Sequence, residues 1–188
     1  LNLNVNNSTT HLLVDDSEHR LHCTSTKKIV QAAVRRHIFI LSSNWLDACL
    51  NSDELVDAHP YEIKGDCHTI LRSSKQNFQY CDRYLFNNSA SEQIYSFAIE
   101  CRQCQGSISR NELIELIELS GAKLYDNTNV INILIVLCDT NENDINDIND
   151  IKTKYLHATT SNVRYVLSDF LLKSIIKFEI QDINKYSL

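Results

Sequence analysis

The sequence is poor in the residues that interrupt packed structure. Its 188 residues include only three glycines and one proline, too few for a collagen-like or low-complexity chain. Long apolar runs are also missing, because stretches such as Ile133–Cys138 are far shorter than a bilayer-spanning segment. Hydrophobic residues nevertheless make up 43% of the chain. We therefore expect a protein with a packed core, built as one large domain or two small ones, with no membrane association.

Basic residues are in the minority. The chain holds 18 Lys and Arg against 24 Asp and Glu, a formal net charge of −6. Because duplex binding depends on cationic contacts with phosphates, we expect no direct sequence-specific binding of nucleic acid. The acidity is uneven: residues 1–90 hold nine basic and ten acidic residues, whereas residues 91–188 hold nine and fourteen.

Methionine is absent, even at position 1, so we expect the chain to be a piece of a longer protein. The seven cysteines are odd in number and irregularly spaced, which favours reduced thiols in an intracellular compartment over a disulfide framework. The one CxxC pair, Cys101 and Cys104, has no second pair at ligand spacing. We therefore expect neither a metal site nor a redox site there.

Short apolar runs alternate with amphipathic segments through the first 55 residues. The expected strands are residues 1–5, 10–14 and 37–41, and the expected helices are residues 27–36 and a segment after Ser43 that contains Trp45 and Cys49. Ser25 or Thr26 is the expected N-cap of the first helix. The outer face of that helix carries the basic residues Lys27, Lys28, Arg35 and Arg36. We interpret Trp45 as a core residue only.

The second half repeats this alternation in a longer form. The expected strands are residues 97–101, 123–125, 132–138 and 164–167, and the expected helices are residues 109–119, 154–158 and 168–178. Ser109 and Glu112 form a capping box, and Gly121 ends that helix. The acidic, repetitive segment 141–150 is expected to be a solvated loop. The order is β-α-β-β-α-β-α, and the first half has the same order without its opening strand and helix.

This order resembles a tandem pair of BRCT repeats, the C-terminal repeats of DNA-damage-response proteins. Three motifs carry the resemblance: Thr10–Val14, the Trp45-x-x-x-Cys49 helix and Tyr61–Asp66. The implied fold class is α/β, with two repeats that each contain a small parallel four-stranded sheet flanked by helices. The opening strand and helix of repeat 1 are then expected upstream of Leu1. The expected domains are repeat 1 at residues 1–66, a linker at 67–84 and repeat 2 at 85–188.

The resemblance also implies a binding site. Such pairs bind a phosphoserine peptide whose third following residue is aromatic, so phosphorylated proteins are the expected partners. Lys28 matches the phosphate-binding lysine, and Thr26 is the nearby hydroxyl donor. The matching positions of the peptide groove are Ser25, Val30, Thr160 and Leu172. Ser25 stands where a close relative has an arginine that grips the peptide main chain, and serine cannot replace its planar set of donors.

The implied function is non-catalytic recognition in a nuclear protein of the DNA-damage response and double-strand-break repair, whose remaining chain includes a RING ubiquitin-ligase domain. Two alternatives stay open. One is a BRCT scaffold that binds proteins without phosphate specificity. The other is a small α/β enzyme, although the sequence contains no glycine-rich phosphate loop, GxSxG elbow or HExxH motif. We expect no cofactor.

Overall fold

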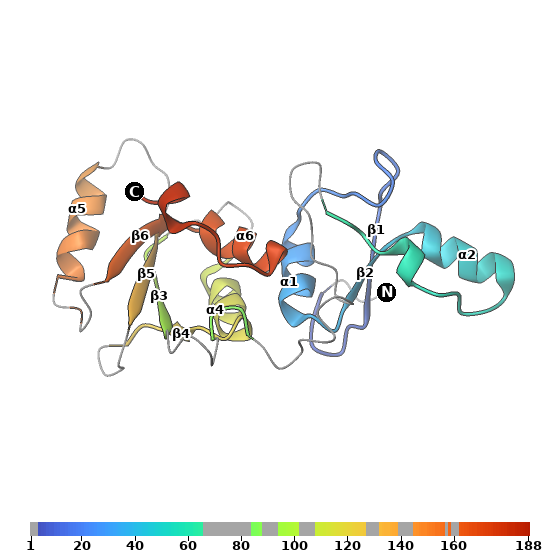
Figure 1. Ribbon diagram of the computed structural model, residues 1–188, viewed down its shortest axis with the longest axis horizontal. Coiled ribbons are helices and arrows are strands. Elements are labelled where there is room, and N and C mark those ends of the chain that lie inside the picture. Colours follow the sequence, from blue (N-terminus) through green and yellow to red (C-terminus); the bar gives the residue numbers. More distant parts are fainter. Residues whose placement is uncertain are drawn as a thin grey trace. The chain divides into compact units, whose positions relative to one another are not determined.

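The computed structural model describes residues 4–65, 84–87, 94–101, 108–126, 132–138, 145–156, 158 and 162–188 (Figure 1). The chain divides into two compact units. Unit 1 contains Leu1–Asp82 and Ile175–Glu179, and unit 2 contains Arg83–Ser174 and Ile180–Leu188. The domain boundaries expected from the sequence, with repeat 1 at 1–66, a linker at 67–84 and repeat 2 at 85–188, stay a prediction.

Unit 1 is built on two parallel strands. Its elements are β1 (His11–Val14), α1 (Lys27–Arg35), β2 (Phe39–Ser42), α2 (Asn44–Ser52) and the short 3-10 helix η1 (His59–Tyr61). β1 pairs with β2 in parallel, with His11 opposite Phe39 and Val14 opposite Ser42. The two strands lie between α1 and α2 (Figure 1). The expected strand-helix-strand-helix order is therefore confirmed from His11 onward, but Asn4 and Val5 are not part of a strand.

Aromatic rings join α2 to the start of the sheet. The His11 ring stacks on Phe39 at 5.3 Å and on Trp45 at 5.1 Å between ring centroids. Trp45 is buried, and its indole N–H donates to the Val56 carbonyl oxygen at 3.1 Å. Since a buried indole needs such an acceptor, this bond also fixes the chain that follows α2. The interpretation of Trp45 as a core residue is confirmed.

Unit 2 contains a complete four-stranded parallel sheet. Its elements are β3 (Tyr95–Ile99), α4 (Arg110–Leu119), β4 (Lys123–Leu124), β5 (Ile133–Cys138), α5 (Ile145–Lys154), β6 (Val163–Leu167), α6 (Asp169–Lys177) and the 3-10 helix η2 (Ile183–Lys185). The strands lie in the order β4-β3-β5-β6, and every pairing is parallel. Helices flank the sheet, with α5 on one side and α4 and α6 on the other (Figure 1). This confirms the predicted α/β fold class.

Alternate residues of the central strands bury on opposite faces of this sheet. On the α5 side, Ala98, Leu134 and Val136 form a cluster with Tyr155 of the chain that follows α5. Phe97, which precedes Ala98 in β3, lies on the other face, where its ring centroid is 5.0 Å from that of Phe86. Burial on both faces explains why β5 is an unbroken apolar run rather than an alternating one.

Helix α4 begins and ends as the sequence predicts. The Ser109 hydroxyl accepts from the Glu112 N–H, while the Glu112 carboxylate accepts from the Ser109 N–H, which completes the capping box. At the other end, the Gly121 N–H bonds to the Glu118 oxygen and the Ala122 N–H to the Ile117 oxygen. This pair of bonds is a Schellman motif, in which Gly121 has a left-handed φ of 86°.

Helix α5 corrects one prediction. Residues 145–150, which the sequence predicts to be part of a solvated loop, belong to α5. The predicted helix at residues 154–158 is wrong, because α5 ends at Lys154. Ile148 and Ile151 stand three residues apart, a spacing that places both on one side of a helix. Ile151 packs against the cluster on the α5 side of the sheet. The prediction of a loop depends on the acidic composition of this segment, whereas the spacing of its isoleucines indicates a helix.

A charged hydrogen-bond group ties α5 to the end of β3. The Glu100 carboxylate accepts from the Tyr155 hydroxyl and, at 2.6 Å, from the Lys154 ammonium. Burial alone raises the pKa of Glu100, but the bonds from Lys154 and Tyr155 outweigh it and hold this pKa below the ordinary value of 4.5. Burial and the bond to Glu100 raise the pKa of Tyr155 above 10.0. The pair therefore joins an ionised carboxylate to a neutral phenol at neutral pH.

Replacing Gly121 should destabilise unit 2 strongly. A Cβ at this position would lie 2.2 Å from the Cβ of Tyr84, in addition to the cost of a left-handed φ. We expect Gly121→Ala to lower the free energy of unfolding by about 2 to 4 kcal/mol, measured by urea denaturation. Gly121→Asn is the control, because asparagine tolerates the left-handed region but carries the same Cβ. A harmless asparagine would show that the contact with Tyr84 is not the cause.

The Glu100 group should make unit 2 sensitive to acid. Because the folded pKa of Glu100 is lowered, its stabilisation is complete above pH 4.5 and is lost as pH falls through the folded pKa. Tyr155→Phe should cost about 1 to 2 kcal/mol at pH 7 and flatten this acid dependence, measured by unfolding at several pH values. Tyr125→Phe is the matched control, since Tyr125 meets Tyr155 ring to ring. Equal effects of the two substitutions would contradict the role of the hydroxyl.

Candidate functional site

The segment that leads from β1 to α1 is held in place by a buried carboxylate. Asp16 accepts from the Leu21 N–H at 2.8 Å and from the Ser42 hydroxyl at 2.5 Å. Further along, the Cys23 N–H donates to the Gly65 oxygen at 2.9 Å. These bonds attach the segment to the end of β2 and to the chain after η1. The start of α1 therefore has a fixed position within unit 1.

The first turn of α1 combines a helix N-terminus with an exposed lysine. Thr26 is the N-cap residue, with extended backbone angles, and its side chain makes no capping hydrogen bond. No acidic residue stands in the first turn. Ser25, Thr26 and Lys28 are all exposed. The positive end of the helix dipole and the Lys28 ammonium act in the same direction, so this turn favours an anion.

The structure brings together three of the predicted site residues, Ser25, Thr26 and Lys28, on adjacent positions of unit 1. Val30, half a turn further along α1, is buried with 4% of its surface exposed. Leu172 lies on α6 and is 6% exposed, and Thr160 lies outside the described residues. The roles assigned to all six residues stay predictions.

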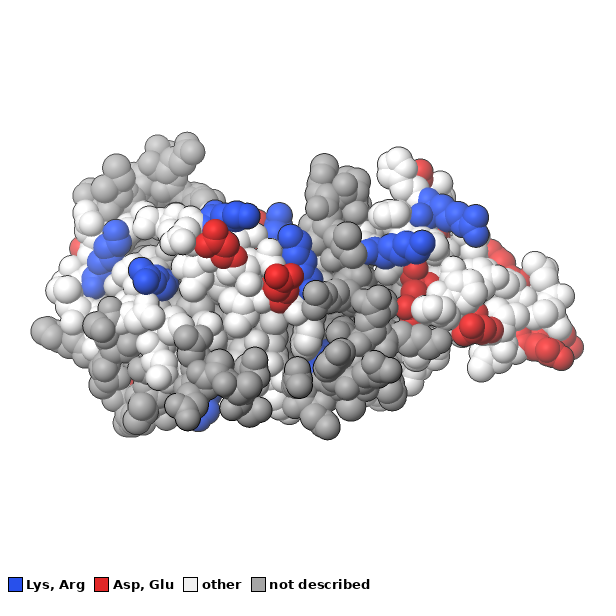
Figure 2. Space-filling view, viewed as in Figure 1, with Lys and Arg blue, Asp and Glu red and all other residues white. Residues whose placement is uncertain are grey.

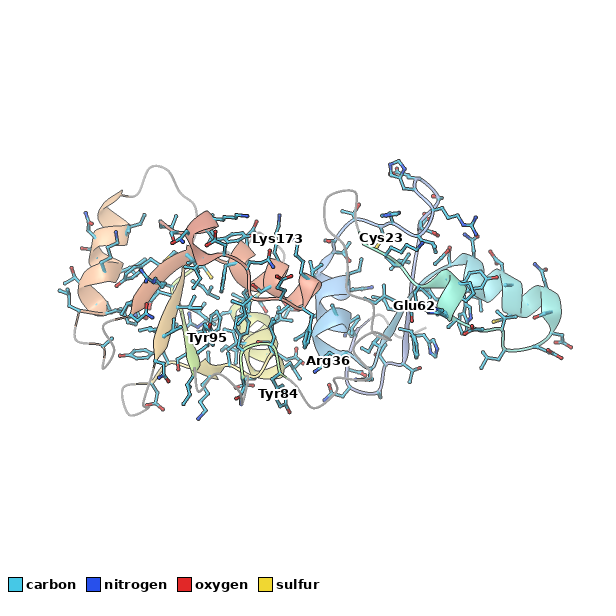
Figure 3. All side chains as sticks on the ribbon, in the orientation of Figure 1. Cys23, Arg36, Glu62, Tyr84, Tyr95 and Lys173 are labelled. Atoms are coloured by element: carbon cyan, nitrogen blue, oxygen red, sulfur yellow. The ribbon has the colours of Figure 1, made fainter. Side chains whose placement is uncertain are left out.

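The outer face of α1 differs from the basic face that the sequence predicts. Arg35 is buried, and its guanidinium donates to the Gln31 carbonyl oxygen at 2.8 Å and to the Asn7 side-chain oxygen at 3.2 Å. Arg36 follows the last turn (Figure 3), and its guanidinium lies 4.4 Å from the centre of the Phe178 ring. Both arginines are therefore part of the packing of unit 1. The exposed basic surface of this helix is limited to its first turn.

One cysteine also departs from expectation. Cys101 is buried and disulfide-bonded, although reduced thiols were expected throughout; its bonding partner and Cys104 lie outside the described residues. Cys23, Cys49 and Cys138 carry thiols outside any disulfide. In the described ranges, no group of three or more His, Cys, Asp or Glu side chains is arranged to hold a metal ion. Nor does any described helix have the length and hydropathy to cross a membrane.

The comparisons with known proteins identify the fold. No protein-family model matches the chain, and no curated protein is similar to it in sequence. Among solved structures, the crystal structure of the BRCT5–BRCT6 domains of Brc1 from S. pombe matches with a TM-score of 0.58. The match covers 95% of this chain and 82% of that chain at 16% sequence identity. The chain therefore has the fold of a tandem BRCT pair, as the sequence predicts.

Removing the Asp16 carboxylate should loosen the segment before α1. Asp16→Ala leaves the Leu21 N–H and the Ser42 hydroxyl without their acceptor, which should lower the free energy of unfolding by about 1 to 3 kcal/mol. Asp15→Ala is the matched control, because Asp15 is exposed and accepts only from nearby Ser17 in the described structure. Hydrogen exchange of the amides at 17–26 measures the loosening. Equal protection in the two variants would contradict the proposed attachment.

Proposed function

We propose that this chain is a non-catalytic module that recognises a phosphoserine peptide with an aromatic residue three positions after the phosphoserine. The observation that carries the proposal is the first turn of α1, which exposes Lys28 and contains no acidic residue, within a tandem BRCT fold. Phosphorylated proteins are then the partners. Neither a cofactor nor a metal is needed for this activity.

The chemistry of a phosphate group suits this turn. A phosphoserine carries a charge of about −1.5 to −2 at neutral pH and three acceptor oxygens. In the proposed site, Lys28 donates a charged hydrogen bond to one oxygen, and the Thr26 hydroxyl donates to a second. Backbone N–H groups of the first turn add further donors. An unphosphorylated serine offers no charge to these groups, so the site would discriminate between the two peptides.

The groove for the rest of the peptide is proposed from the remaining residues. Val30, Thr160 and Leu172 would border the slot for the aromatic side chain. Ser25 would face the peptide main chain, where it offers a single hydroxyl instead of the planar donor set of an arginine. We therefore propose a weaker grip on the peptide main chain than in repeats that carry arginine there.

We infer that the parent protein acts in the nucleus, in the DNA-damage response and double-strand-break repair. The segment Tyr165–Leu188 resembles, without a gap, the final repeat of the breast cancer type 1 susceptibility protein, with Phe170 in place of the usual tryptophan. The burial of Phe170 is compatible with that exchange. The second choice for a similar protein is the RING-domain partner of that protein. If the parent is similar to either protein, it would carry a RING ubiquitin-ligase domain outside these residues.

A second candidate function is a protein-binding scaffold without phosphate specificity. The observation in its favour is the burial of Val30 and Leu172, because side chains so fully covered offer little surface to an aromatic residue of a peptide. Ser25 also favours a scaffold, because it lacks the planar donor set with which an arginine would hold a peptide main chain. Such a scaffold would bind a phosphorylated peptide and its unphosphorylated form equally.

A calorimetric titration tests the proposal. The full-length protein is titrated with a phosphoserine-x-x-Phe peptide and, separately, with the unphosphorylated form of that peptide. We expect tighter binding of the phosphorylated peptide, and Lys28→Ala should weaken that binding about 10- to 100-fold, as the loss of a charged hydrogen bond does. Lys64→Ala is the matched control, because Lys64 is an exposed lysine of the same unit. Equal binding of both peptides would favour the scaffold, whereas equal losses in both variants would show that the phosphate does not bind at Lys28.

A further inference from the structure

The connection between β1 and α1 is basic where it approaches α1. Residues 19–46 contain five Lys and Arg residues and no acidic residue. Arg35 and Arg36 are part of the packing of unit 1, whereas Arg20 in this connection is exposed. Lys64, in the chain that follows η1, is exposed as well. Since the whole chain has a net charge of −6, this part of unit 1 has the opposite sign.

Backbone hydrogen bonds hold these two exposed cations on neighbouring segments. The Lys64 N–H donates to the Leu21 carbonyl oxygen at 2.8 Å, and the Leu21 N–H donates to the Asp16 carboxylate at 2.8 Å. Leu21 has a φ of 60°, in the left-handed region that a leucine rarely adopts. The two bonds offset the cost of this conformation. They also fix Arg20 beside Lys64, although the two residues are far apart in the sequence.

Neither cation has a partner of opposite charge in the described part of the chain. No ion pair or hydrogen bond joins the side chain of Arg20 or Lys64 to another described residue. Two cations on neighbouring segments repel each other, and a bound anion would relieve that repulsion. Asp15 and Glu18 are exposed at the start of the same connection, and Asp15 accepts from the Ser17 N–H. Glu18 therefore borders the basic surface and opposes an incoming anion.

The Arg20–Lys64 surface, named for its two cations, lies away from the elements expected upstream of Leu1. In element order, β1-α1-β2-α2 corresponds to β5-α5-β6-α6, and α4 lies on the side of the unit 2 sheet opposite α5. The counterpart of α4 is therefore expected on the α2 side, whereas the β1–α1 connection leads to the other side. Counterparts of β3 and β4 are expected beside β1. The chain before Lys64 lies at the opposite edge, where the Ile63 N–H donates to the Ile40 oxygen of β2.

Charge is separated within unit 1. The acidic residues of α2 and the chain after it are all exposed; they are Asp47, Asp53, Glu54 and Asp57. In the right part of Figure 2, which unit 1 forms, blue side chains gather along the upper edge, and red ones lie below them and at the right end. A negatively charged segment is therefore attracted to one side of the unit and repelled by the α2 side.

We propose that Arg20 and Lys64 bind an acidic segment of a partner protein whose aspartate or glutamate side chains need no phosphate. The Arg20 guanidinium can hold one carboxylate through two parallel hydrogen bonds, and the Lys64 ammonium offers a single point of charge to the next one. Neither residue belongs to the proposed phosphate site at Thr26 and Lys28. The Arg20–Lys64 surface is thus a second contact of unit 1, beyond the phosphopeptide.

The number of cations argues against other anionic partners. Double-stranded nucleic acid is bound through many phosphate contacts, and the exposed carboxylates of α2 would repel its remaining length. An anionic membrane surface is recognised by clusters of about four to eight Lys and Arg residues. A short acidic segment of a protein is the partner that two cations can match.

The probe is a labelled peptide without phosphate in which glutamate alternates with serine, about 12 residues or ~40 Å long when extended. Its binding to the full-length protein is measured by fluorescence anisotropy at two salt concentrations. The controls are a peptide with glutamine in place of glutamate and a single-stranded oligonucleotide of equal charge. We expect binding of the glutamate peptide, weakened by salt because the contact is electrostatic, and no binding of the glutamine peptide.

Four variants and a control locate the surface. Arg20→Ala and Lys64→Ala should each weaken binding about two- to fivefold, as the loss of one exposed charge pair does. The double variant Arg20→Glu/Lys64→Glu should abolish binding, and Glu18→Gln should strengthen it. Lys185→Ala is the matched control, because Lys185 is an exposed lysine of unit 2, and it should leave binding unchanged. Unfolding curves of each variant verify the fold.

Several results would overturn the proposal. No binding of the glutamate peptide at low salt would reject it directly. Equal losses in Lys185→Ala and Arg20→Ala would show that the peptide responds only to the net charge of the protein. A loss in Lys28→Ala but not in Arg20→Ala would assign the acidic segment to the phosphate site. Tighter binding of the oligonucleotide, lost in the double variant, would assign the surface to nucleic acid. Because the probe carries no phosphate, its failure would leave the outcome of the phosphopeptide titration unaffected.

Discussion

A parallel sheet must be covered on both of its faces, and this constraint organises both units. In unit 2 it is met by side chains that alternate along β3: Ala98 lies on the α5 side and Phe97 meets Phe86 on the other. In unit 1 the described residues form two strands, and α1 and α2 flank them.

Much of the fold could be predicted because short-range rules determine it. The capping box of Ser109 and Glu112 and the left-handed Gly121 use only neighbouring residues, so the sequence alone locates both ends of α4. The apolar run of β5 likewise predicts a strand buried on both faces. Helix α5 differs from the predicted solvated loop because its acidic composition is typical of a loop, whereas the spacing of its isoleucines is typical of a helix.

Long-range contacts account for what the sequence could not predict. Arg35 and Arg36 were expected on a solvated basic face, but their partners are the Asn7 side chain and the Phe178 ring, both far from α1 in the sequence. The positions of Thr26 and Lys28 at the start of α1 followed from helix pattern and capping preferences. Their phosphate role was suggested by the family resemblance, because a lysine on a helix has no chemistry that singles it out.

The contact between Arg36 and Phe178 affects the order in which the protein can fold during synthesis. Unit 1 is discontinuous: it includes the first part of the chain and also Ile175–Glu179. When the ribosome has released the first half of the sequence, Arg36 has no ring to pack against. Domains of a growing chain usually fold from the N-terminus onward. Here unit 1 is completed only after most of unit 2 has been translated.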